Sequence, residues 1–187
     1  SDEKTEPQEE SKKELLKGIS LLMEGEKSTA VSGKEAADFE GAGTEASPYE
    51  ITSAADLKKL AENVKNGTDY EGKYFQLTVN IDLKNEEWTP IGTIVYTGEF
   101  GRSEERYFKG TFDGDGHQIA NLTITGRNEY VGLFGYVRNA TIQNCNVAGE
   151  VSGYNAVGGI VGAVDGKTNN ILNCSFQGNV TGNVYVG

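Results

Sequence analysis

Three copies of one short pattern, each running from an isoleucine to a glycine, lie in the C-terminal part of this chain of 187 residues. They are Ile119–Gly126, Ile142–Gly149 and Ile171–Gly178, and their isoleucines are 23 and 29 residues apart. Two Gly-x-x-Gly segments, Gly132–Gly135 and Gly159–Gly162, lie between the copies. Self-similarity at a period of about 20 to 30 residues predicts a solenoid, in which each repeat packs on its neighbours.

The repeats favour stacked β-coils over stacked helices. Apolar residues alternate within each copy, and the units are too short and too rich in glycine for helix pairs. Equivalent residues of stacked coils lie about 4.8 Å apart. We therefore expect an internal ladder of Ile119, Ile142 and Ile171. A second ladder at the corner is expected from Asn121, Asn144 and Asn173.

The N-terminal residues 1–47 differ in composition from the repeats. Residues 1–10 are acidic and polar, which is typical of a solvated arm. Ser11 and Glu14 form a capping-box pattern before an apolar stripe, which predicts a short amphipathic helix at 11–24. The small polar residues that follow, up to position 47, indicate a linker.

Residues 48–107 are expected to form an N-terminal cap and the first coils, and residues 108–187 the repeats. Ser53 and Asp56 form a second capping box, and Asn66-Gly67 forms a helix stop. The apolar stripe between them predicts a helix and consists of Leu57, Leu60, Ala61 and Val64. Strands are predicted at 74–79 and 81–83.

The formal net charge of −11 argues against nucleic-acid partners and against binding to an anionic membrane. No apolar run approaches the roughly 18 residues that span a bilayer, so we expect no membrane insertion by this chain. The one histidine, His117, excludes a two-histidine zinc site within this sequence. We predict no catalytic residue, no cofactor and no metal site, and therefore no enzyme.

Two features leave alternatives open. Asp113 and Asp115 beside His117 favour a glycine-rich turn over a calcium site, because the EF-hand spacing of ligands is absent. Cys145 and Cys174 occupy equivalent repeat positions, which places them within disulfide range, although inward-facing small apolar side chains are the simpler interpretation.

Tyrosines are the candidate ligand-binding residues. Tyr130 and Tyr185 both precede Val-Gly at one repeat position, and Ala156 stands at the intermediate one. Tyr154 lies close by in the sequence. Exposed aromatic rings on a flat β-face can stack on sugars, whereas the alternative is that they complete the scaffold.

The segment Phe108–Ile119, followed by Asn121–Ile124 and Gly132-Leu-Phe-Gly135, resembles the GLUG-repeat surface proteins of bacteria. The lead-in from Tyr49 through Trp88-Thr-Pro-Ile-Gly92 resembles them too. The resemblance covers roughly 48–187. It implies a right-handed parallel β-helix, an extracellular or cell-surface location and an adhesin-like role.

On this basis we expect a mainly β chain with short N-terminal helices that displays a binding face to a host or matrix glycan or protein. Two alternatives remain. One is a polysaccharide-binding or polysaccharide-processing β-helix. The other is the spacer or repeat region of a larger surface peptidase.

Overall fold

The computed structural model describes residues 38–98 and 101–187. Residues Phe39–Gly187 form one compact unit. The predicted arm at 1–10, the predicted helix at 11–24 and most of the predicted linker lie outside the described residues. The division into 1–47, 48–107 and 108–187 stays a prediction.

The described part of the chain contains one α-helix, α2 (Ala54–Lys65), whose ends match the sequence signals. Ser53 caps its N-terminus, because the serine hydroxyl accepts a hydrogen bond from the backbone N–H of Asp56. Gly67 follows the helix with a φ of 107°, which suits glycine. The predicted apolar stripe is buried and consists of Leu57, Leu60, Ala61 and Val64.

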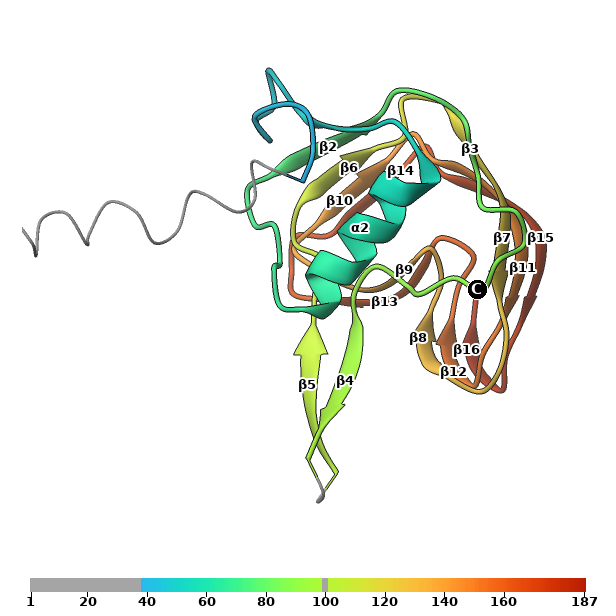
Figure 1. The fold of residues 1–187 in the computed structure, drawn as a ribbon. Helices are drawn as coiled ribbons and strands as arrows, with labels where there is room; N and C mark the ends of the chain where they lie inside the picture. Colours follow the sequence, from blue (N-terminus) through green and yellow to red (C-terminus); the bar gives the residue numbers. More distant parts are fainter. Residues whose placement is uncertain (1–37, 99–100) are drawn as a thin grey trace, which may run out of the picture. The chain divides into compact units, whose positions relative to one another are not determined.

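Short strands build the rest of the described chain (Figure 1). The first eight are β1 (Tyr49–Ile51), β2 (Tyr74–Leu77), β3 (Ile81–Asp82), β4 (Thr93–Thr97), β5 (Arg102–Arg106), β6 (Thr111–Asp113), β7 (Gln118–Ile124) and β8 (Glu129–Val131). The others are β9 (Phe134–Arg138), β10 (Thr141–Gln143), β11 (Asn146–Ser152), β12 (Asn155–Val157), β13 (Val161–Asp165), β14 (Asn170–Leu172), β15 (Ser175–Thr181) and β16 (Val184–Val186).

Parallel pairing stacks these strands into a β-solenoid, which confirms the predicted fold class (Figure 1). The parallel sheets have the orders β1-β2-β6-β10-β14, β15-β11-β7-β3, β16-β12-β8 and β13-β9. Each coil contributes one strand to a given sheet, so the sheets form the walls of the solenoid. Helix α2 contacts β1, the first strand of its sheet, and its buried face joins the same hydrophobic cluster as the strands.

The register of the first repeat differs from the one that the sequence pattern predicts. Ile142 pairs with Ile171 as expected, but on its other side it pairs with Phe112 and not with Ile119. Ile119 lies one strand further along the coil and pairs with Val147. The corner before β7 spans residues 114–117, whereas the corner before β11 spans only 144–145. The similar segments at Ile119 and Ile142 therefore lie in different sheets, and the predicted isoleucine ladder is wrong at Ile119.

The asparagine ladder is correct for two of its three members. The Asn173 side-chain amide donates to the Asn144 side-chain oxygen at 3.2 Å. Asn121 instead donates to Asp82 at 2.8 Å. Its φ is 59°. It lies between Ile119, which pairs with Val147, and Leu122, which pairs with Gly149, so β7 has one more residue than β11 over this stretch. Asn121 thus belongs to a β-bulge, where asparagine tolerates the left-handed backbone.

The interior of the described residues is apolar throughout, with no buried polar or charged side chain. Phenylalanine rings fill its centre, with 5.2 Å between the centroids of Phe112 and Phe134 and 5.3 Å between Phe108 and Phe134.

The Gly-x-x-Gly segments allow close backbone contact between coils. A Cβ added at Gly135 would lie 2.4 Å from the carbonyl oxygen of Gly92. A side chain at this position would collide with the neighbouring backbone, so glycine is required there.

One hairpin projects from the stack (Figure 1). Strands β4 and β5 pair antiparallel over their whole length. Ile91, just before β4, forms a bridge with Phe134, and Phe108, just after β5, forms a bridge with Val137. The hairpin therefore leaves from one end of β9 and returns to the same strand.

Candidate functional site

The predicted tyrosines Tyr130, Tyr154 and Tyr185 all lie on the β8-β12-β16 side of the solenoid. Tyr130 and Tyr185 occupy equivalent positions in β8 and β16, with Ala156 of β12 between them. Two steps between stacked strands separate them, or about 10 Å. Tyr185 is 80% exposed and Tyr154 is 43% exposed. The three residues therefore share a surface, but Ala156 interrupts the row.

Tyr130 belongs to a different aromatic group. Its ring stacks on that of Tyr136 of β9, with 4.8 Å between centroids and 7° between planes. Tyr136 also contacts Tyr107, which follows β5, with 4.5 Å between centroids. We call Tyr107, Tyr130 and Tyr136 the tyrosine cluster. All three rings are half-buried, so the cluster presents part of its aromatic surface to solvent.

Charged groups border the tyrosine cluster. The Arg138 guanidinium lies 5.3 Å from the centroid of the Tyr107 ring, which is a cation–π contact. The Tyr107 hydroxyl donates to the Glu105 carboxylate. Burial and the hydrogen bond to Glu105 raise the pKa of Tyr107, and burial raises the pKa of Tyr130. Both hydroxyls therefore keep their protons in neutral and mildly alkaline solution.

Sequence reasoning identified Tyr130 but missed Tyr107 and Tyr136. Tyr107 reaches the cluster only because the β4–β5 hairpin returns to β9. No periodic pattern in the sequence predicts that return. Tyr130 and Tyr136 are six residues apart and lie on either side of the corner between β8 and β9. The alternation of side chains within one strand does not predict which residues meet across such a corner.

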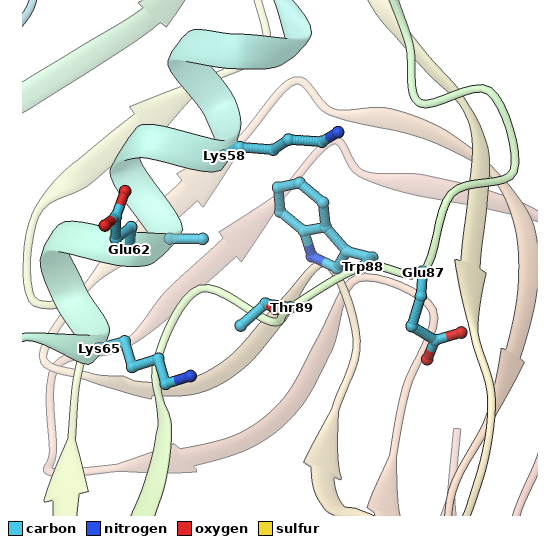
Figure 2. Close-up of a pocket in the computed structure, with 7 residues that line it drawn as sticks. Lys58, Glu62, Lys65, Glu87, Trp88 and Thr89 are labelled. Atoms are coloured by element: carbon cyan, nitrogen blue, oxygen red, sulfur yellow. The ribbon is translucent and has the colours of Figure 1, made fainter.

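A cleft lies between α2 and the segment that follows β3 (Figure 2). It has a volume of about 300 Å³ and is lined by Lys58, Ala61, Glu62, Lys65, Glu87, Trp88 and Thr89. The Trp88 indole N–H donates to the carbonyl oxygen of Leu133 at 3.0 Å. Glu87 accepts two hydrogen bonds from Thr125, and Lys58 forms an ion pair with Glu86.

The polar groups of this cleft thus mostly hold neighbouring segments together. Trp88 is only 4% exposed, which leaves little of its ring for a ligand. Figure 2 shows Lys65 and Glu62 on the helix side, where they border the opening. We interpret the cleft as the junction between α2 and the segment after β3, not as a binding site.

The turn around His117 has the predicted glycine-rich geometry. Asp115 and Gly116 have φ values of 47° and 75°, and the backbone N–H of Asp115 donates to the Asp113 carboxylate at 2.8 Å. Gln143 and Asn144 also donate to that carboxylate. Asp113 therefore links two coils, which supports the turn interpretation over the calcium one. Among the described residues, no three His, Cys, Asp or Glu side chains gather as a metal site would require.

Cys145 and Cys174 stack in neighbouring coils, as their equivalent repeat positions predict. Both thiols are free in the structure. Each donates to the backbone carbonyl two residues before it at 3.2 Å. The hydrogen bond with the Cys174 thiol and burial raise the pKa of Cys145. Cys145 thus behaves as the small apolar core residue that the simpler interpretation describes.

Comparisons with curated proteins found two relatives. Halomucin from Haloquadratum walsbyi is 35% identical over 160 residues, which cover 80% of this chain and 2% of halomucin. A protein from Evansella cellulosilytica described as a Gly-rich membrane protein is 30% identical over 140 residues, which cover 71% of this chain and 14% of that protein. This chain therefore spans a small part of each relative.

A solved structure described as an immunoglobulin A1 protease from Bacteroides ovatus is 26% identical to this chain, with a TM-score of 0.49. The match covers 76% of this chain and 51% of the other. No family model matches the chain. Within the described ranges, no helix is long and apolar enough to cross a membrane.

Proposed function

We propose that this chain is an adhesin-like, non-enzymatic β-solenoid module of an exported cell-surface protein. In this proposal its coils are GLUG-type repeats, and they hold a binding face for a host or matrix ligand. Similarity to halomucin and to a protein described as a membrane protein supports the surface location. The small share of each relative that the chain covers supports a module of a longer protein.

The tyrosine cluster is the observation that carries the proposal. Its rings come from two neighbouring strands, β8 and β9, and from the end of the hairpin. The stacked coils fix these elements, so little conformational entropy is lost when a ligand binds. Half-exposed aromatic rings bordered by Arg138 and Glu105 suit a ligand with both apolar faces and hydrogen-bonding groups, as sugars and peptides have.

A binding screen tests this function. Purified chain is applied to a glycan array and to immobilised matrix proteins, together with Tyr130→Ala and, as a matched control, Tyr185→Ala. Loss of one ring at the centre of a contact costs about 1.4 kcal/mol or more, so we expect at least a tenfold weaker response for Tyr130→Ala. Tyr185 lies outside the cluster, and its variant should bind like the parent chain.

Two results would contradict the proposal. One is no binding to any glycan or matrix protein by the parent chain. The other is equal binding by Tyr130→Ala and the parent chain to every ligand that the parent chain binds, which would remove the tyrosine cluster from all the interfaces found. Melting curves of both variants show whether a loss of binding reflects unfolding.

A further inference from the structure

A polar groove lies over a different sheet from the tyrosine cluster, on the outer face of β2, β6 and β10. It has a volume of about 500 Å³, within the range of roughly 300–1,000 Å³ that small-ligand pockets occupy. Its lining includes six outward-facing side chains of the three strands: Tyr74, Gln76, Thr111, Asp113, Thr141 and Gln143. All six are half-buried.

Strand register arranges the floor of the groove in two rows. Tyr74, Thr111 and Thr141 are paired across the three strands, which makes the first row. Gln76, Asp113 and Gln143 make the second row in the same way. Neighbours within a row are about 4.8 Å apart. The floor thus offers hydroxyl, amide and carboxylate groups at regular steps along the solenoid.

One wall of the groove is a tight turn just before β1, which contributes Glu45, Ala46 and Pro48. The turn is closed by hydrogen bonds between Thr44 and Ser47. Its Gly43 lies against the Tyr49 ring, and the Gly43 carbonyl accepts from the Tyr74 backbone N–H at 3.2 Å. The wall is therefore attached to the floor, and the groove is formed before any ligand arrives.

Asp113 is held in place within the floor. Its carboxylate accepts from the side chains of Gln143 at 2.7 Å and Asn144 at 2.9 Å, and from the backbone of Asp115. Partial burial raises the pKa of Asp113, but these bonds outweigh it and the net pKa lies below its ordinary value. The group is thus a fixed anion at neutral pH, with its geometry set by both coils.

Other polar groups of the floor have no hydrogen-bond partner within the part of the chain that the structure describes. Among the described residues, no hydrogen bond is made by the Tyr74 hydroxyl, the Gln76 amide or the Thr111 hydroxyl. Half-buried polar groups of this kind gain free energy when a ligand offers matching donors and acceptors. A ligand with many hydroxyls satisfies them, because each hydroxyl both donates and accepts.

We propose that this groove binds a neutral oligosaccharide. The lining contains two carboxylates, Glu45 and Asp113, and no lysine, arginine or histidine, which disfavours anionic sugars. An extended peptide is disfavoured for another reason. Peptides that add to a sheet need an open strand edge, whereas this floor is the face of a sheet whose strands are already paired. The site is separate from the tyrosine cluster and does not depend on it.

The test uses the whole chain, with isothermal titration calorimetry against neutral linear hexasaccharides of glucose, xylose and mannose and against an oligogalacturonate. Thr141→Arg places a long side chain in the groove. Asn170→Arg is the matched control, because Asn170 pairs with Thr141 in the next coil and lies outside the groove lining. Both variants lose the same hydrogen bond between these two side chains.

We expect at least one neutral hexasaccharide to bind, with at least tenfold weaker affinity in Thr141→Arg, parent-like affinity in Asn170→Arg and no binding of the oligogalacturonate. Gln76→Ala, a smaller change, should weaken binding too and covers the case in which Thr141→Arg fails to fold. No binding of any neutral probe, or binding that neither groove variant weakens, would overturn the proposal. The groove variants leave the three rings of the tyrosine cluster in place, so a hexasaccharide whose affinity falls in Thr141→Arg and Gln76→Ala binds in the groove. This separates failure here from failure of the tyrosine cluster.

Discussion

The middle residues of β8, β12 and β16 share a left-handed backbone conformation. Tyr130, Ala156 and Tyr185 have φ values of 54°, 53° and 52°. Strain at a single tyrosine could indicate a functional site, but the same value recurs in three coils with different side chains. The conformation is therefore a requirement of the coil, and the ring at position 130 is not its cause.

This requirement makes Ala156→Gly a stabilising substitution. An L-residue in the left-handed region costs about 1–2 kcal/mol, whereas glycine costs about 0.5–1 kcal/mol of extra entropy on folding. We expect a net gain of about 0.5–1 kcal/mol in the free energy of unfolding, measured by urea denaturation. Ala163→Gly in β13, where φ is not positive, should destabilise by a similar amount. A loss of stability in Ala156→Gly would show that the methyl contacts outweigh the backbone strain.

At the scale of single elements, the N-terminus of α2 depends on few side chains. Ser53→Ala removes the acceptor for the Asp56 backbone N–H and should lower the free energy of unfolding by about 1 kcal/mol. Ser103→Ala on exposed β5 is the control, expected to change it by less than about 0.5 kcal/mol. Equal stability of the two variants in urea would mean that the cap contributes nothing.

The same cap predicts a pH dependence. Partial burial raises the pKa of Asp56, but hydrogen bonds from Thr52 and Ser53 outweigh it, so the folded-state pKa lies below the ordinary value. The stabilisation is therefore complete above the unfolded pKa of about 3.9 and is lost as the pH falls through the lower folded value. Asp56→Asn should show a shallower decline in melting temperature than the parent below about pH 4. An identical decline in both proteins would assign the acid sensitivity to other carboxylates.

Elements whose start, end and buried face are marked by residues in or next to the element were predictable from the sequence. Helix α2 has an apolar stripe within its own residues, a capping box that begins at Ser53 just before it and a glycine stop at Gly67 just after it, and all three were correct. The register of the first repeat was not predictable in this way. Ile119-Ala-Asn121 and Ile142-Gln-Asn144 look alike, but the first lies in a bulged strand and the second ends β10. Their own residues do not show that they belong to different sheets.

At the scale of the whole molecule, the stability lost on truncating an inward-facing residue should depend on whether other coils pack on both sides of it. Ile142 and Ile171 belong to one ladder, yet Ile142 is fully buried and Ile171 is 41% exposed in the last described coil. Ile142→Ala should cost about 2–5 kcal/mol, and Ile171→Ala clearly less. Urea denaturation of both variants measures the difference. Equal losses would argue against a stack in which each coil is stabilised by its neighbours.

The candidate sites are products of this stacking, which explains why sequence alone located them only in part. Tyr130 was identified through its repeat position, whereas its partner Tyr107 comes from the end of a hairpin. Tyr74 and Gln76 alternate outward in a predicted strand, but the wall at Glu45 and Pro48 faces them only in the fold. Contacts between coils depend on corner lengths, which local patterns do not encode.

The attachment of the β4–β5 hairpin bears on how such a chain diversifies. Ile91 and Phe108 form bridges to the same strand, β9, so both ends of the hairpin are fixed to that strand. Lengthening a loop between anchored ends costs little, about 0.6 kcal/mol for each doubling. The solenoid can therefore exchange this segment for another without altering its coils. The hairpin is therefore a suitable site for inserting foreign peptides. In evolution, changes in this segment can create new binding surfaces while the solenoid stays the same.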